Sequence, residues 1–356
     1  MRARRQSPSE FESELARLKG RSAAVVYSFS PEATATKLWY DQWRSAVISA
    51  YGSALETLGI HPYYLDVTSF CRQALARDLP DMICAFNLNA GVTPITHWAV
   101  VPAVAAWCGI PPLPAEADVL LMGERKDIAN LVAASCGFHV PTTYSKAEAE
   151  RLADLSDLVV KPRDLGGSVG LRRTNPRDLE ATSPEEISII QEFVPGVDLT
   201  VPIVFQPTQG RYRAVAGVVY RPLQEHPLQW MHDQASKLDG TGYVKQIVEV
   251  PPELEERFVA FAAAAQLGPY SRLDLRLRAK SPDPDEAGFW TQEIAFMEVN
   301  PLPTLRQGIN FLNVVASDPF RTAFRSEFEV LEGLVGAGAN DLSLTLVLAC
   351  ALATLD

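Results

Sequence analysis

Strand-like and helix-like segments alternate along residues 21–112, and this alternation restricts the fold more than any other feature of the chain. Residues 21–29 are rich in small and β-branched side chains, which favour a strand. Residues 43–59 place apolar side chains at steps of three and four, as in an amphipathic helix that ends at Gly59. HPYYLDV and DMICAFNL read as two more strands with helical sequence between them. The pattern predicts a parallel α/β domain.

After residue 120 the sequence changes to several strand-like runs joined by loops, with two helical segments among them. The apolar run at 343–355 is too short to span a bilayer comfortably, so we expect a buried terminal helix there. The expected divisions at the two ends are an N-terminal arm at 1–20, the parallel α/β domain at 21–118, and a C-terminal helical segment at 321–356.

Composition and charge argue against several functions. The 356-residue chain has a formal net charge of −11, which opposes nonspecific binding of nucleic acid because that needs a basic surface. No uninterrupted apolar run reaches ~18 residues, and no apolar segment follows the basic start, so neither a membrane span nor a secretory signal is predicted. Five scattered cysteines without a CxxC pair are interpreted as reduced thiols. We therefore expect a cytoplasmic protein that binds neither nucleic acid nor membranes.

A glycine-rich stretch, LVVKPRDLGGSVGLRR at 158–173, follows a strand-like run and contains Lys161 and Ser168. Glycines let the backbone approach an anion and direct several N–H groups at it, and Lys161 adds a positive charge. The same glycines could serve only to turn a β-hairpin, and the stretch lacks the GK[ST] of a Walker A loop. An anion-binding loop and a plain hairpin both remain open on these residues.

The stretch SIIQEFVPGVDL at 188–199 ends a strand in a short linker and places Asp198 seven residues after Gln191. An adenine ring needs a backbone carbonyl and an N–H along one edge, with apolar walls on its faces. A carboxylate commonly accepts hydrogen bonds from ribose hydroxyls. PGVD is also a good turn sequence, so a turn explains the stretch when it is taken alone.

Acidic and amide side chains interrupt two apolar strand-like runs, SRLDLRL and FMEVNPL. In strand geometry Arg272, Asp274 and Arg276 share one face, and so do Glu298 and Asn300. If the strands are neighbours, Asp274, Glu298 and Asn300 form a cluster of the oxygen ligands that Mg²⁺ prefers. Arg272 would neutralise a phosphate or a substrate carboxylate beside them. The alternative is a salt-bridged sheet face turned to solvent.

The order and spacing of ERKD, KPxxxGGSVG, QEFVPGVDLT, SRLDL and MEVNPLPTL resemble the ATP-grasp superfamily, most closely its D-alanine–D-alanine ligase branch. The resemblance covers about residues 109–305. It implies an ATP-grasp fold, in which ATP lies between two α+β subdomains, with an N-terminal parallel α/β domain ahead of them. The small ATP-grasp subdomain is expected at 119–205, and the large one, with the metal site, at 206–320. It also implies the chemistry of that family, an ADP-forming ligation in which a carboxylate becomes an acyl phosphate that an amine attacks.

In the nucleotide site, the resemblance implies that Lys126 and Lys161 contact the phosphates of ATP. Ser168 matches a position in the loop that closes over those phosphates, and Asp198 matches the acid that binds the ribose. The adenine-contacting linker is expected to consist of Gln191, Glu192, Phe193 and Val194. The resemblance thus makes ATP the expected cosubstrate.

In the metal and catalytic site, Asp274, Glu298 and Asn300 match the magnesium ligands, which implies two Mg²⁺ ions with Mn²⁺ as a substitute. Arg272 matches the arginine that stabilises the intermediate, and Lys237 resembles the lysine of a mobile loop that reaches the γ-phosphate. These groups would bring positive charge to two negative reactants, as activation of a carboxylate requires.

Both acceptor pockets depart from the D-alanine–D-alanine ligase pattern. Glu32 is a loose counterpart of a residue in the first substrate loop, AFNLNAGVTP replaces an HG-to-GEDG stretch, and Thr304 stands where the family has glycine. Asn87, at a strand end, and His232, in the mobile-loop segment, are further candidates for substrate contact. We expect a ligase that joins an amino acid or small peptide carboxylate to an amine in specialised metabolism, such as antibiotic biosynthesis.

Three other functions fit parts of the pattern. The chain could be a D-alanine–D-alanine ligase proper, or a phosphotransferase that stops at a stable phosphorylated product. It could also be a nucleotide-binding partner protein without turnover, although retention of Lys161, Arg272 and the three metal-ligand candidates speaks against that reading. The resemblance also implies a homodimer, which is the usual oligomeric state in that family.

Overall fold

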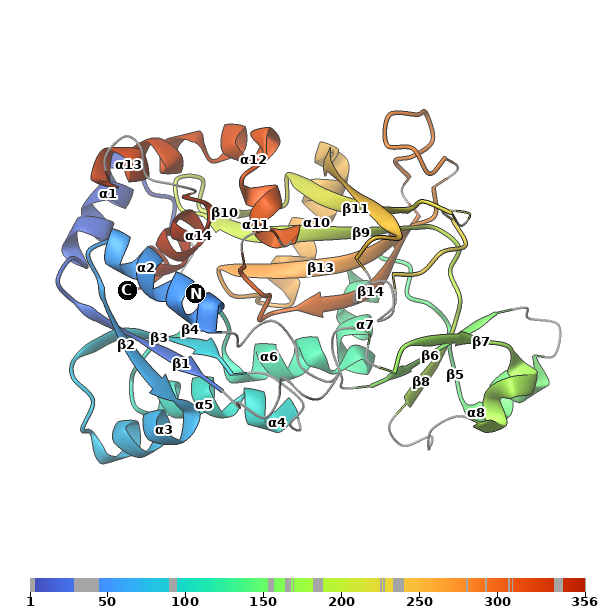
Figure 1. Cartoon of the computed structure of the whole chain (residues 1–356), viewed down its shortest axis with the longest axis horizontal. Helices are drawn as coiled ribbons and strands as arrows, with labels where there is room; N and C mark the ends of the chain where they lie inside the picture. The colour runs from blue at the N-terminus through green and yellow to red at the C-terminus, as the bar shows by residue number, and fades with distance from the viewer. Residues whose placement is uncertain are drawn as a thin grey trace.

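Three β-sheets surrounded by helices form the fold in this computed structural model of the chain. Figure 1 shows the N-terminal sheet at one end, the four-stranded sheet of β5–β8 at the other, and the largest sheet between them. The structure describes residues 4–28, 45–89, 95–152, 157–163, 168, 170–181, 188–224, 226, 228–232, 240–279, 281–291, 293–306, 308, 310–335 and 342–355.

The N-terminal sheet is parallel, in the strand order β2-β1-β3-β4. Its region contains β1 (Ser22–Tyr27), α2 (Ser45–Thr57), β2 (His61–Asp66), α3 (Val67–Ala76), β3 (Met82–Leu88), α4 (Ile95–Trp98), α5 (Val100–Trp107) and β4 (Pro112–Leu113). Side chains of β1 alternate between two cores, so Val25 packs on the side of α2 whereas Val26 packs with α3 and α5. Helices on both faces of a parallel sheet confirm the predicted α/β domain.

The largest sheet is antiparallel, in the order β12-β11-β9-β13-β14, and β10 pairs with the end of β9. It contains β9 (Val197–Gln206), β10 (Arg211–Arg213), β11 (Ala216–Pro222), β12 (Tyr243–Glu249), β13 (Tyr270–Leu277) and β14 (Ile294–Asn300), with α10 (Pro252–Ala264) between β12 and β13. One face is apolar, where Leu199 and Leu273 pack with Phe258 of α10. The opposite face is polar at several positions and carries the candidate site.

The four-stranded sheet is antiparallel, in the order β5-β8-β6-β7. Before and within it lie α6 (Ala117–Glu124), α7 (Lys126–Ser135), β5 (Thr143–Tyr144), α8 (Lys146–Arg151), β6 (Leu158–Pro162), β7 (Arg172–Thr174), the 3₁₀ helix η3 (Pro176–Ala181) and β8 (Ser188–Glu192). Leu158 and Val160 point into a small core with Ala149 of α8. Since strand side chains alternate, Lys161 and Gln191 lie on the opposite face of this sheet.

The two ends of the chain pack against each other and against the larger sheets (Figure 1). The helices are α1 (Pro8–Arg17), α11 (Asn310–Val315), α12 (Asp318–Ala323), α13 (Arg325–Val335) and α14 (Ser343–Leu352). Helix α1 packs on α13, and α14 packs between α2 and β9 with all of its residues buried, which confirms the predicted buried terminal helix. Among the helices that the structure describes, none combines the length and apolarity needed to cross a membrane.

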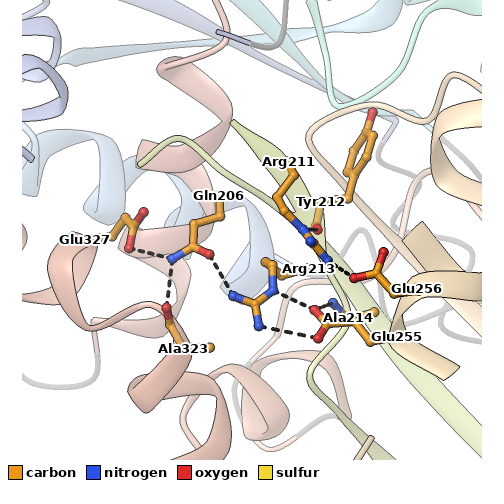
Figure 2. Close-up of polar contacts among 9 residues, drawn as sticks. All are labelled: Gln206, Arg211, Tyr212, Arg213, Ala214, Glu255, Glu256, Ala323 and Glu327. Carbon is orange, nitrogen blue, oxygen red and sulfur yellow. Dashed lines mark hydrogen bonds and ion pairs between the residues drawn. The ribbon is translucent and has the colours of Figure 1, made fainter. Parts of the chain in front are cut away.

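A buried carboxylate ties the C-terminal helices to the largest sheet. Glu327 of α13 is 0% exposed and accepts hydrogen bonds from the Nε2 of Gln206, at 3.1 Å, and from the backbone N–H and hydroxyl of Thr208. Figure 2 shows that Gln206 in turn accepts from Arg213, at 3.1 Å, and that Arg213 pairs with Glu255 of α10, at 2.6 Å. The network therefore joins α13, the β9–β10 turn and α10.

Candidate active site

Five polar side chains of three neighbouring strands meet on the polar face of the largest sheet. Directly opposite residues of an antiparallel pair project to the same face. Asp274 of β13 lies opposite Thr200 of β9 and Glu298 of β14, and Arg272 lies opposite Asn300. The register thus confirms that the two acidic strands are neighbours and that their polar residues share a face.

Asp274 is the most heavily bonded member of this group. It accepts hydrogen bonds from Thr200 Oγ1 at 2.8 Å, from Arg272 Nε and Nη2 at 3.0 and 2.6 Å, and from Asn300 Nδ2 at 3.0 Å. Burial lowers the pKa of the Arg272 guanidinium, but the neighbouring Asp274 raises it, and the net shift is upward. The Arg272 and Asp274 side chains are 20% and 21% exposed, so this pair is a salt bridge that is largely withdrawn from solvent.

Two buried lysines face Glu298 from different parts of the chain. Lys126, the first residue of α7, places its Nζ 3.8 Å from Glu298 Oε2. Lys161, on β6, donates to the backbone carbonyl of Met297 at 3.4 Å. Burial, reinforced by the charge of Lys126, lowers the pKa of Lys161 to about 8, against the opposing effect of Glu298. Two desolvated cations beside a carboxylate form a site that would attract a polyanion.

The oxygen atoms at this point fit a magnesium ion. The two carboxylates, Asp274 and Glu298, and the amide oxygen of Asn300 are hard donors of the type that Mg²⁺ takes together with phosphate oxygens and water. In the part of the chain that the structure describes, no three His, Cys, Asp or Glu side chains gather at one point. The fit therefore depends on Asn300 and on ligands that a substrate or solvent would add. A carboxylate has about four acceptor positions, so binding through Asp274 would require one of its present donors to move.

The linker after β8 is held by specific side-chain contacts. Gln191 is buried, and its Nε2 donates to Thr143 Oγ1 at 3.1 Å and to the carbonyl of Pro141 at 3.3 Å. Glu192 Oε1 lies 3.1 Å from Nε2 of His139, whose backbone bridges to β14. These contacts anchor the linker to both the four-stranded sheet and the largest sheet. The linker thus runs along the boundary between the two sheets.

Asp198 lies at the start of β9, on the same face as Thr200 and Asp274. Its Oδ1 accepts a hydrogen bond from Arg276 Nη1 at 2.8 Å, and its Oδ2 accepts from the backbone N–H of His232 at 2.9 Å. The carboxylate is therefore fixed by one residue of β13 and by one residue of the segment that follows β11.

His232 belongs to a cluster of aromatic rings. Its ring centroid lies 4.3 Å from that of Tyr220, 4.7 Å from that of Tyr243 and 5.5 Å from that of Trp230. Its carbonyl accepts from Ser168 Oγ at 3.4 Å, and Ser168 has a left-handed backbone with φ of 63°. The structure therefore brings together the glycine-rich loop and the mobile-loop segment, while the roles of Ser168 and His232 stay predictions.

The other predicted substrate residues are not assembled into one site by the described structure. Asn87 is buried and donates from Nδ2 to the carbonyl of Trp98 at 3.1 Å, a contact that holds α4 to β3. Thr304 is partly buried in the loop after β14. Glu32 and Lys237 lie outside the described residues. Their substrate and catalytic roles stay predictions.

Thr200 and Arg276 have no predicted role in the sequence, although both contact the predicted site. Thr200 bonds to Asp274, and Arg276 bonds to Asp198. The available signal was strand alternation, because Thr200 follows Asp198 by two positions and Arg276 follows Asp274 by two. What the pattern could not supply was the pairing of β9 with β13.

Comparison with known proteins agrees with this architecture. Residues 127–216 match the family profile of the ATP-grasp domain. The crystal structure of D-alanine–D-alanine ligase from Bacillus anthracis is 16% identical, covering 88% of this chain and 98% of that one, with a TM-score of 0.57. VanG D-Ala:D-Ser ligase from Enterococcus faecalis is 14% identical, covering 89% and 100%, with a TM-score of 0.58. The ATP-grasp ligase PsnB, solved with a minimal precursor, is 14% identical, covering 89% and 99%, with a TM-score of 0.54.

The chain therefore carries an ATP-grasp domain, and the match confirms the predicted resemblance. Its whole architecture is the ATP-grasp fold with an N-terminal parallel α/β domain, as found in the D-alanine–D-alanine ligase and VanG structures. At these identities the likeness shows the fold alone. No curated protein sequence matches the chain significantly.

Proposed function

We propose that this chain is an ATP- and Mg²⁺-dependent carboxylate–amine ligase that forms an amide or peptide bond and releases ADP. The observation that carries the proposal is the convergence of Asp274, Glu298 and Asn300 on one sheet face with Lys126 and Lys161 beside them. Such a site combines oxygen ligands for a metal with desolvated cations for phosphates.

ATP is proposed to bind between the two antiparallel sheets. Lys126 and Lys161 would contact its phosphates, and Asp198 would accept from its ribose hydroxyls, while the linker at 191–194 would contact the adenine. Two structures of the same fold support ATP and Mg²⁺ as its ligands, namely a D-alanine–D-alanine ligase complexed with ATP and PsnB complexed with Mg and ADP. Asp274, Glu298 and Asn300 would hold Mg²⁺, which supplies positive charge to offset that of the phosphates.

The proposed reaction has two steps. A substrate carboxylate oxygen attacks the γ-phosphorus of ATP, the bond from that phosphorus to the bridging oxygen breaks, and ADP leaves with an acyl phosphate as the other product. An amine nitrogen then attacks the acyl carbon, the carbon–oxygen bond to phosphate breaks, and inorganic phosphate leaves as the amine loses a proton. Arg272 would stabilise the negative charge that develops between the two reactants.

The proposed substrates are an amino acid or small peptide carboxylate and an amine. The altered acceptor motifs, with Thr304 in place of the family's glycine and with Glu32 as a loose counterpart, support a role in specialised metabolism such as antibiotic biosynthesis. A cytoplasmic location and a homodimer stay predictions.

Release of ADP tests the proposal directly. The chain is incubated with ATP, Mg²⁺ and a panel of L- and D-amino acids, singly, in pairs and with hydroxylamine as a surrogate amine. We expect one acid to yield a hydroxamate together with ADP, which would identify the donor and show acyl-phosphate chemistry. A phosphorylated product that resists hydroxylamine would instead indicate a phosphotransferase. ATP binding without turnover across the panel would oppose ligation of amino acids.

The metal-site variant Glu298→Gln should abolish this turnover. The matched control is Glu293→Gln, the same change at a surface position shortly before β14, where the side chain is 70% exposed. Unchanged ADP release in Glu298→Gln would contradict the placement of the metal.

A further inference from the structure

A phenylalanine of the proposed adenine-contacting linker makes cation–π contacts with two arginines. The Cζ atom of Arg173 lies 3.8 Å from the ring centroid of Phe193, and that of Arg276 lies 5.0 Å from it. Arg173 belongs to β7 of the four-stranded sheet, whereas Arg276 belongs to β13 of the largest sheet. This cluster, formed by Arg173, Phe193 and Arg276, therefore bridges the two sheets that would enclose the nucleotide.

The same two arginines hold a short segment after β11. Arg173 donates from Nη1 to the carbonyl of Gln229 at 2.7 Å and from Nη2 to its side-chain oxygen at 3.1 Å. Arg276 donates from Nη2 to the carbonyl of Trp230. Leu228 accepts from the backbone N–H of Gly196 at 2.8 Å. Residues 228–230 are thus bound from both sheets and lie close to the linker.

Arg276 further connects this segment to the linker and to Asp198. It also donates from Nε to the carbonyl of Val194 at 2.6 Å and from Nη1 to Asp198 Oδ1 at 2.8 Å, and its side chain is only 4% exposed. Asp198 is bonded in turn to the backbone N–H of His232. One buried guanidinium therefore connects the linker, the proposed ribose acid and the segment at 228–232. The planar guanidinium fork carries five N–H donors in fixed directions, which suits three acceptors that lie on different sides of it.

We infer that Arg276 is a positioning residue for the nucleotide, a role that rests on the proposed function. It fixes Asp198 for the ribose and holds residues 228–232 against the adenine-contacting linker. Arg276 and the His232 N–H each occupy one oxygen of Asp198, and each oxygen of a carboxylate can accept a second hydrogen bond. A ribose can thus bind Asp198 while both of these contacts persist.

The inference is tested with Arg276→Met, which removes the donors while keeping an unbranched apolar chain, and with Arg276→Lys, which keeps the charge. The control is Arg278→Met, since Arg278 lies just beyond β13, is 44% exposed and pairs only weakly, at 3.7 Å, with Glu293. Titration calorimetry measures binding of a non-hydrolysable ATP analogue with Mg²⁺. We expect binding about tenfold weaker in both Arg276 variants, because hydrogen bonds to a charged group are lost, and unchanged binding in the control.

A double-mutant cycle separates positioning from general loss of structure. If Arg276 acts through Asp198, the loss of affinity in Arg276→Met and Asp198→Asn combined is smaller than the product of the two single losses. Losses that multiply would overturn the inference, as would analogue binding in Arg276→Met within about twofold of the wild type.

Hydrogen exchange without nucleotide gives a second readout. The His232 amide is bonded to Asp198, so it should exchange faster in Arg276→Met than in the wild type and in Arg278→Met. Equal exchange in all three proteins would overturn the inference even if the variant binds less nucleotide. A wild-type chain that binds no ATP analogue would overturn the proposed function instead, and the exchange rates would still decide whether Arg276 holds the segment.

Discussion

Replacement of Glu327 by glutamine should destabilise the protein although it preserves the shape of the side chain. Both carboxylate oxygens accept hydrogen bonds, one from Gln206 and the other from Thr208. A glutamine can present an oxygen to one side only, so its NH₂ group must face a donor on the other side. Gln206 cannot adapt by rotating its amide, because its Nε2 also donates to Ala323 and its Oε1 accepts from Arg213 (Figure 2).

The expected loss in the free energy of unfolding follows from the hydrogen-bond donors that lose their acceptor in Glu327→Gln. At least one buried donor is left unsatisfied, which costs about 1–3 kcal/mol, and removal of a buried charge offsets part of this. We therefore expect a loss of about 2 kcal/mol in the free energy of unfolding. Urea unfolding followed by circular dichroism measures it. The control is Glu332→Gln on the same helix, where the side chain is 49% exposed and its pair with Arg321 should contribute little.

Two results would refute this reasoning. If Glu327→Gln and Glu332→Gln differ by less than about 0.5 kcal/mol, the network around Glu327 does not stabilise the fold. If Glu327→Gln also weakens ATP binding strongly, the network is not merely structural. Gln206 and Asp198 are eight positions apart on β9, or about 26 Å along the strand, so nucleotide affinity should be unaffected.

Three further measurements test other parts of the structure. ATP affinity, measured by calorimetry, should fall as the pH rises through about 8, because burial lowers the pKa of Lys161 to that value and the neutral amine attracts phosphate less. An affinity that does not change with pH would exclude Lys161 from phosphate binding. Electron paramagnetic resonance measures Mn²⁺ binding in the presence of ADP, which should weaken about tenfold or more in Glu298→Gln but not in Glu293→Gln. Equal Mn²⁺ affinities in the two variants would remove Glu298 from the metal site. Asn87→Leu should lower the free energy of unfolding by about 1–3 kcal/mol, because the Trp98 carbonyl loses its hydrogen-bond donor. An unchanged urea midpoint would show that this hydrogen bond does not stabilise the fold.

Much of the fold could be predicted from local patterns. The alternation of strands and helices up to residue 112 predicts a parallel sheet with helices on both faces, and the structure has such a sheet there. The shared face of Arg272 and Asp274, and that of Glu298 and Asn300, followed from the two-residue period of a strand. These predictions succeeded because each depends on neighbouring residues whose geometry the backbone sets directly.

Contacts between distant segments could not be predicted in the same way. Lys126 and Lys161 approach Glu298 from a helix and from a separate sheet, and nothing in their own surroundings specifies that meeting. Arg276 reads as an ordinary strand residue until β9 pairs with β13 and brings Asp198 within 2.8 Å. Such contacts form only when the sheets pack, because packing desolvates the charged groups and makes each of them depend on a partner far away in the sequence.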